Sequence, residues 1–172
     1  MDAQNAVRQQ LGFWHGTLGQ VMSDCDDGTA HKKLPGSTTE SIAAIYAHIM
    51  FSQDVITNVM LAGKQPVYQS GAWEAKTGVP FPNGAPSLAD DWAKTIAMKL
   101  PEFHEYGKAV QQSVDGYLAG LSDSDMQRKV KGPFGEQTVE WVVVNILGTH
   151  LPAHAGEIAA LKGVQGLKGL PF

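Results

Sequence analysis

The feature that most constrains this fold is a helical spacing of apolar residues over long stretches of the chain. Within residues 4–22, the apolar stripe consists of Val7, Leu11, Trp14, Leu18 and Val21. Steps of four and three residues place side chains on one face of a helix, whereas a half-buried strand requires alternation at every second residue. The sequence therefore predicts an amphipathic helix from about Gln4 to Met22.

A second helix is predicted between residues 38 and 63. Its inward stripe consists of Ile42, Ile45, Ile49, Ser52, Ile56 and Val59. Thr38 or Thr39 can serve as the N-cap, because a threonine hydroxyl accepts a hydrogen bond from a free amide of the first turn. Gly63 is placed to end the helix, since glycine readily adopts the left-handed conformation found there.

The connection over residues 64–86 is long and rich in Gly and Pro. A connection of this length inside a domain usually packs across it or has a function of its own. Trp73 and Phe81 provide apolar anchors, so we expect this segment to dock on the helices as a lid.

Two more helices complete the pattern. Residues 87–117 form the third helix with Ser87 as its N-cap, and Pro101 must kink or break it because proline lacks an amide hydrogen. Residues 131–135, with the sequence KGPFG, form a turn or the tip of a short hairpin, and the fourth helix covers about residues 138–162. Four long helices without a convincing run of strands predict an all-α fold, a four-helix bundle.

Length and composition limit the classes of partner and the compartment. The 172 residues suit a single domain over residues 1–172. A formal net charge of -4 argues against nucleic acid as the main partner. No segment approaches the ~18 apolar residues of a membrane span, and the first residues do not resemble a signal peptide. The single cysteine excludes an intramolecular disulfide, so we expect a cytoplasmic protein.

The strongest candidates for chemistry are His150 and His154. They stand four residues apart on the fourth helix, so their rings leave the same face about 6 Å apart along the axis. Tracing that helix places Val143, Leu147 and Leu161 on the same stripe, which predicts that both rings point toward the core. Buried imidazoles need hydrogen-bond partners. One metal ion would satisfy both rings, and bonds to carbonyls or buried water are the alternative.

His48 supplies a third nitrogen from the second helix. It lies at the edge of the inward stripe, three residues after Ile45, and the small Ser52 one turn later leaves room for a water or a substrate. Three neutral nitrogen donors with an open fourth position are typical of catalytic rather than structural zinc sites, and they also suit nickel or iron. We therefore predict one divalent metal ion on His48, His150 and His154.

The other histidines and the cysteine are weaker candidates. His15 adjoins the stripe of the first helix and could approach the same end of the bundle as a ligand or a hydrogen-bonding neighbour, although a boundary position is the simpler interpretation. His31 and His104 are predicted to be solvated. Cys25 lies in an acidic run, residues 24–27, whose charge should raise the pKa of its thiol and make it a poor nucleophile.

Three short motifs occur in a recognisable order along the chain. These are His48 in the second helix, the segment LSDSD at residues 121–125, and the segment HLPAHAGEI at residues 150–158. Together they resemble the DinB-like metal-binding four-helix bundles, and the resemblance spans nearly the whole chain. It implies a long crossover connection, a homodimer and a divalent ion on the three histidines, nickel or zinc first and iron or manganese otherwise. Characterised relatives include transferases and isomerases that use low-molecular-weight thiols such as mycothiol or bacillithiol.

Two residues near the histidines deserve separate interpretation. The family usually has glutamine where this chain has Glu157, three residues after His154 on the same helix face. Glu157 is therefore a candidate catalytic base, fourth ligand or hydrogen-bond acceptor, and a partly exposed carboxylate that offsets the metal charge is the alternative. Pro152 lies between the two ligands and removes the helical hydrogen bond to Gly148, which predicts a bend near the site.

Two functions are compatible with this pattern. A metal-dependent enzyme, either a thiol S-transferase or a hydrolase, would use the open position to activate a thiol or a water. A non-catalytic metal-binding or ligand-binding module is the alternative. A bundle without any ion would require three inward histidines to be a coincidence.

Overall fold

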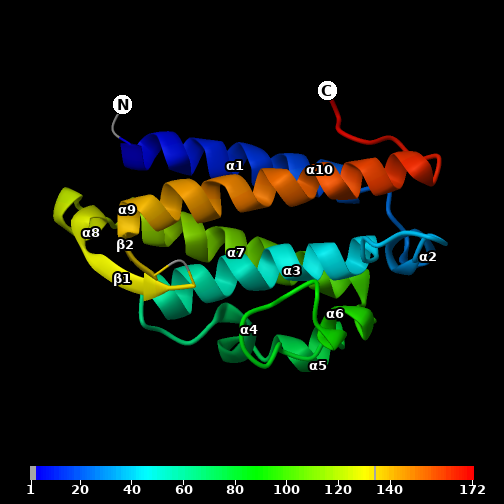
Figure 1. Cartoon of the computed structure of the whole chain (residues 1–172), viewed down its shortest axis with the longest axis horizontal. Coiled ribbons are helices and arrows are strands. Elements are labelled where there is room, and N and C mark those ends of the chain that lie inside the picture. The colour runs from blue at the N-terminus through cyan, green and yellow to red at the C-terminus, as the bar shows by residue number, and fades with distance from the viewer. Residues whose placement is uncertain (1–2, 134) are drawn as a thin grey trace.

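The computed structural model describes residues 3–133 and 135–172, which form a bundle of long helices with one small hairpin (Figure 1). The long segments are α1 (Ala3–Met22), α3 (Ile42–Asp54) with the π-helix η1 (Val55–Leu61), α7 (Leu100–Ala119), and α9 (Val139–Val142) with the π-helix η2 (Val143–Leu147) and α10 (Gly148–Val164). The joining elements are α2 (Asp27–His31), α4 (Val67–Ser70), α5 (Trp73–Thr77), α6 (Asp91–Lys94), α8 (Asp123–Gln127), β1 (Lys129–Gly132) and β2 (Gly135–Thr138). The predicted all-α bundle is confirmed.

The directions of the long helices explain the crossover. In Figure 1, α1 and α10 run one way along the bundle, whereas α3 and α7 run the other way. Antiparallel neighbours can be joined at one end, but the parallel pair α3 and α7 requires the chain to return along the whole bundle. Residues 62–99 make this return through α4, α5 and α6. The predicted long crossover connection is therefore confirmed.

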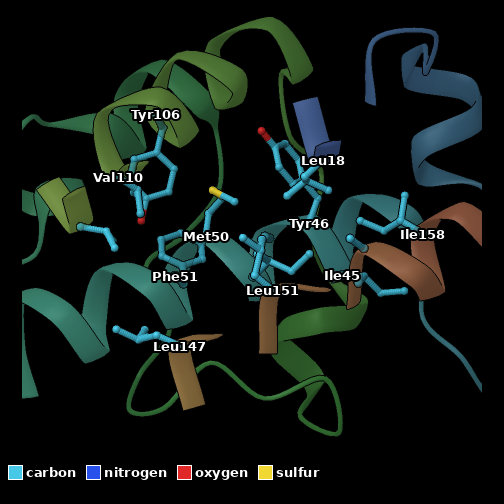
Figure 2. Packing of buried hydrophobic residues seen from close by; sticks show 14 of the residues in the cluster. Leu18, Ile45, Tyr46, Met50, Phe51, Tyr106, Val110, Leu147, Leu151 and Ile158 are labelled. Carbon is cyan, nitrogen blue, oxygen red and sulfur yellow. The ribbon is translucent and has the colours of Figure 1, made fainter. Parts of the chain in front are cut away.

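The core lies where α1, α3, α7 and α10 meet, and α3 is its most buried helix. Every residue of α3 except His48 is buried. Figure 2 shows side chains from all four helices packed together, with Leu18 of α1, Phe51 of α3, Val110 of α7 and Leu151 of α10 among them. Each such side chain contributes about 1.5–3 kcal/mol on burial, so we expect the bundle to fold without a metal ion.

A buried carboxylate fastens the crossover to the bundle. Asp54 is 0% exposed and ends α3. It accepts hydrogen bonds from the amides of Val67 (2.8 Å) and Tyr68 (2.9 Å) in α4. It also accepts from the Tyr106 hydroxyl of α7 (2.9 Å) and from Asn58 Nδ2 of η1 (2.8 Å). One side chain thus ties three parts of the fold together.

The crossover docks on the bundle through aromatic side chains. Trp73 and Phe81 pack against the core, which confirms the predicted docking. Tyr68 is buried more deeply, at 1% exposed, and its ring centroid lies 4.6 Å from that of Phe51. Its hydroxyl bonds the Thr77 hydroxyl at 2.7 Å, so this tyrosine joins α4 to the end of α5.

The predicted start of the second helix is wrong by a few residues, whereas its end is confirmed. Ser41, not Thr38 or Thr39, is the N-cap of α3, and its hydroxyl accepts from the amide of Ala44 at 3.2 Å. Gly63 follows η1 with a φ of 64°, the left-handed conformation expected after a helix.

The predicted third helix is broken just before Pro101, which confirms the predicted effect of that proline, but its first part is only one turn long. Ser87 begins a turn, and Asp90 rather than Ser87 precedes the one-turn helix α6. The long helix α7 begins only at Leu100, with Pro101 in its first turn. A proline is favourable there because the first amides of a helix have no partner within the helix.

The last connection contains the predicted hairpin. Strands β1 and β2 pair antiparallel from Lys129↔Thr138 to Gly132↔Gly135. Phe134, at the predicted tip, lies outside the described residues. Thr138 then caps α9 by accepting a hydrogen bond from the Trp141 amide, so the predicted start of the fourth helix is confirmed. In the part of the chain that the structure describes, no helix is long and apolar enough to cross a membrane.

Candidate metal centre

Three histidine rings converge between α3 and α10. The ring centroid of His48 lies 4.6 Å from that of His150 and 4.7 Å from that of His154, and the latter two are 4.5 Å apart. One potential ligand nitrogen from each ring lies within 4.8 Å of the other two. The structure therefore brings the three predicted histidines together from two helices.

The rings lie at the edge of the core and not inside it, so the predicted core-facing orientation is wrong. The buried residues of α10 include Leu151, Ala155 and Ile158, whereas His150 and His154 are half-buried beside them. The stripe traced from Val143 fails because residues 143–147 form a π-helix, whose wider turn shifts every later residue around the axis. The edge position gives the rings an apolar backing and an open side.

Two of the rings are oriented by hydrogen bonds from Nδ1 to protein acceptors. His48 Nδ1 lies 2.8 Å from the Pro86 carbonyl oxygen of the crossover. His154 Nδ1 bonds the Glu157 carboxylate. Since a carbonyl oxygen or a carboxylate only accepts, both rings carry a proton on Nδ1, which leaves Nε2 as the nitrogen that can bind an ion. Partners of this kind fix the orientation and tautomer of metal-binding histidines.

The third ring, His150, faces His48 directly. Their Nε2 atoms are 2.8 Å apart, slightly less than the about 3.3 Å between two nitrogens on one tetrahedral zinc ion. His150 Nδ1 is buried without a hydrogen-bond partner among the described groups. Burial, followed by repulsion from neighbouring imidazoles, lowers the pKa of His48 to about 4 and that of His150 to about 3. Both rings are then neutral at pH 7, the form that binds a metal, and the donor set fits a divalent ion.

Glu157 stands behind His154 and not among the converging nitrogens. Its side chain is 45% exposed and contacts the His154 ring on Nδ1, the side opposite the free lone pair. The group that could hold an ion in the described residues consists of His48, His150 and His154. This geometry favours the role in which Glu157 accepts a hydrogen bond and so orients His154. It does not favour the role in which Glu157 is the fourth ligand.

The loss of a helical hydrogen bond at Pro152, between His150 and His154, is compensated from another helix. Pro152 leaves the Gly148 carbonyl without its helical donor. Gln10 of α1 donates to that carbonyl through Nε2 at 3.3 Å, and η2 ends at the adjacent Leu147. The π-helix η2 therefore lies directly before the proline turn, in the region where Pro152 predicted a bend.

The remaining histidines lie outside this cluster. His15 is buried between α1 and α7, so it is not one of the grouped ligands. The prediction that His31 and His104 are solvated is wrong. His31 Nε2 accepts from the Met98 amide at 3.0 Å, and His104 Nδ1 lies 3.1 Å from the Tyr46 hydroxyl.

Comparison with known proteins identifies the family. The model of the DinB superfamily matches residues 14–158, a range that includes the three clustered histidines and Glu157. The chain belongs to the DinB superfamily. This DinB-superfamily chain also superposes on the crystal structure of a conserved protein from Enterococcus faecalis with a TM-score of 0.80, at 16% identity over 96% of this chain and 99% of that one. That likeness shows a shared fold. The search of curated proteins finds no match.

Proposed function

We propose that this protein is a metal-dependent enzyme that holds one divalent ion on His48, His150 and His154. The observation that carries the proposal is the convergence of three imidazoles, two of which are oriented by acceptors behind them. Structural zinc usually has four protein ligands, whereas catalytic zinc keeps an open position. An ion on this cluster would lower the pKa of a water or a thiol and so supply a nucleophile near neutral pH.

The protein groups around the cluster have distinct roles in this proposal. Pro86 brings the crossover against His48, so the crossover forms one wall of the site and orients that ring. Glu157 orients His154, and its exposed carboxylate can exchange a proton with solvent. We infer that Glu157 takes up the proton of the reacting thiol or water through intervening solvent, because it lies behind His154 and out of direct reach of the open position.

The proposed substrate is a small molecule that reacts with a low-molecular-weight thiol. Support for thiol transfer over hydrolysis comes from the resemblance to DinB-like transferases and not from the geometry, because an open three-histidine site serves both reactions. A non-catalytic metal-binding module is the alternative that the experiment must separate.

The first test is the metal content of protein purified without an affinity tag. We expect about one equivalent of zinc or nickel, and a loss of affinity above about 100-fold in His150→Ala and in His154→Ala, since even the groups behind a ligand account for 10–100-fold. His104→Ala is the matched control, because it removes a histidine outside the cluster. An unchanged affinity in either ligand variant would refute the site.

The second test separates enzyme from module. Glutathione, bacillithiol and mycothiol are each offered with an electrophile, and simple esters are offered for hydrolysis, with and without chelator. Turnover that disappears with the ion and returns on its addition supports the enzyme. Stoichiometric metal binding without turnover of any thiol or ester would favour the binding module instead.

A further inference from the structure

A cleft of about 660 Å³ lies on the opposite face of α3 from the metal centre. It is bounded by α1, α3 and the first half of α7. Tyr46 and Met50 line it, two residues before and after His48, and two residues along a helix turn the side chain by about 200°. Figure 2 shows Tyr46, Met50 and Leu18 next to one another on this side of the core. The volume is typical of small-molecule sites.

The floor of the cleft is apolar and is kept open by glycines. The apolar lining consists of Leu18, Met22, Met50, Leu100 and Pro101. Gly19 and Gly107 line it as well, and a Cβ at Gly107 would lie 2.8 Å from the Tyr46 hydroxyl. Glycine at this position therefore permits the close approach of α3 and α7 and leaves space beside them.

One of the polar side chains that line the cleft, His15, is buried. It is 8% exposed, and its Nε2 is covered and has no hydrogen-bond partner among the described groups. Burial lowers the pKa of His15 to about 4, so the ring is neutral at pH 7. A neutral ring at this position carries no positive charge that would repel a cationic ligand.

The lining carries more negative than positive charge. Its carboxylates are Asp26, Asp27 and Glu105, and its cation is Lys108. Glu105 already pairs with Lys108 at 2.6 Å, so the two aspartates give the lining its negative character. A ligand that places a positive group there gains from this charge.

Cys25 lines the cleft but does not indicate covalent chemistry. Burial, followed by the charges of Asp24 and Asp26, raises the pKa of its thiol, and Lys162 opposes this only in part. The predicted direction is confirmed, although burial rather than the acidic run is the main cause. A thiol held in its neutral form is a poor nucleophile, so a ligand here binds without a bond to sulfur.

We propose that this cleft binds a small organic amine, with its apolar body on the floor of the cleft and its ammonium group beside Asp26 and Asp27. The site is separate from the metal centre, because the two open on different faces of α3. Apolar lining and negative charge together favour an amphiphilic cation over a purely apolar molecule or an anion.

The proposal is tested with three probes that share a phenethyl body and differ in charge: phenethylamine, phenethyl alcohol and 3-phenylpropionate. Calorimetric titration of the full chain should show the amine binding about tenfold more tightly than the alcohol, and 3-phenylpropionate most weakly. The double variant Asp26→Asn, Asp27→Asn should remove the preference for the amine while the alcohol binds as before. Asparagine at residue 26 still caps α2.

A matched pair of glycine variants locates the binding. A Cβ at Gly19 or at Gly16 meets nothing within 4 Å, and only Gly19 lines the cleft. Gly19→Leu should therefore abolish amine binding, whereas Gly16→Leu should leave it unchanged. Equal affinity for the three probes, no amine binding to the wild type, or equal losses in both leucine variants would overturn the proposal.

Sedimentation of the same proteins completes the test. If the wild type and Gly16→Leu are dimers and Gly19→Leu is a monomer, the cleft is an interface with a second copy, and the proposal is overturned. An oligomeric state that is the same in all three proteins is the result we expect.

Discussion

The two faces of α3 carry histidines in opposite arrangements. On one face, His48, His150 and His154 lie with ring centroids 4.5–4.7 Å apart. On the other face, His15 and His104 stand apart around a cleft of about 660 Å³. Rings that converge and are oriented by hydrogen-bond acceptors suit a single metal ion. Rings spread around a cavity suit a larger organic molecule.

The two faces also differ in what supports them. The three-histidine cluster depends on the crossover, because the Pro86 carbonyl orients His48, and the crossover is fastened by Asp54. The cleft is lined by α1, α3, α7 and the segment around α2, and no crossover residue between α3 and α6 is among its lining residues. Changes in the crossover should therefore affect the two sites unequally.

The largest expected effect is that of Asp54→Ala. Removing a fully buried carboxylate leaves four donors unpaired, so we expect a loss of about 3–5 kcal/mol in the free energy of unfolding. Urea denaturation measures it, and metal affinity should fall more than amine affinity. Asp115→Ala is the control, because Asp115 is exposed and its solvent-screened pair with Arg8 contributes little to stability. Equal losses in the two variants would contradict the role of Asp54.

Removing the metal ion tests whether the ion at the three-histidine cluster is required for folding. The apolar core is large, so the metal-free protein should remain helical and lose only about 2.7 kcal/mol relative to protein with metal at a hundredfold excess over Kd. Thermal unfolding followed by circular dichroism shows the shift, and His48→Ala should not show it. A metal-free protein with a random-coil spectrum would mean that the ion is required for folding.

Local periodicity was enough to predict the long helices and the three histidines, because spacing along one helix fixes which side chains share a face. It failed where the helix was not regular. The π-helix over residues 143–147 turned His150 and His154 from the core to its edge. Pro101 was recognised as a breaker, but only the structure shows that it begins a helix instead of kinking one.

Contacts between distant residues were not accessible from the sequence. Pro86 meets His48 across 38 residues, and Asp54 meets Tyr106 across 52 residues. No local pattern marks a carbonyl oxygen as the partner of a ring, or one aspartate among many as buried. The cleft was missed for the same reason, since its lining comes from segments that the fold alone brings together.

The pH dependence of stability tests the burial of His15 beside the cleft. His15 has a pKa of about 4 in the folded protein because it is buried, below the about 6.5 of an unfolded chain. The unfolded state therefore binds more protons between these values, and stability falls as the pH falls from 6.5 to 4. Other charged or titratable groups lining this part of the seam between α1 and α7 are Arg8, Cys25, Asp26, Asp27, Tyr46, His104, Glu105, Lys108 and Asp115.

Replacing His15 with leucine should remove its part of this loss. We expect the difference between the unfolding free energies of wild type and His15→Leu to change by about 2 kcal/mol between pH 7.5 and 4.5. Metal-free protein is used for both, so that losses from the clustered histidines cancel in the comparison. Parallel pH profiles for the two proteins would show that His15 is not held neutral by burial.

The smallest expected effect is that of Glu157→Gln on metal affinity, and it separates orientation from catalysis. Glutamine keeps a carbonyl oxygen for His154 Nδ1 but removes the charge, so we expect about a tenfold loss of affinity or less. If Glu157 also accepts the proton of the reacting thiol or water, kcat should fall at equal metal loading while KM stays nearly constant. Glutamine is the usual residue of the family at this position, and a full rate in the variant would show that no carboxylate is needed there. That result would leave Glu157 as a positioning residue, and the thiol or water would then lose its proton to solvent.

Glu157→Ala, which removes the acceptor altogether, should weaken metal binding more than Glu157→Gln in either case, and equal affinities in the two variants would contradict the orienting role.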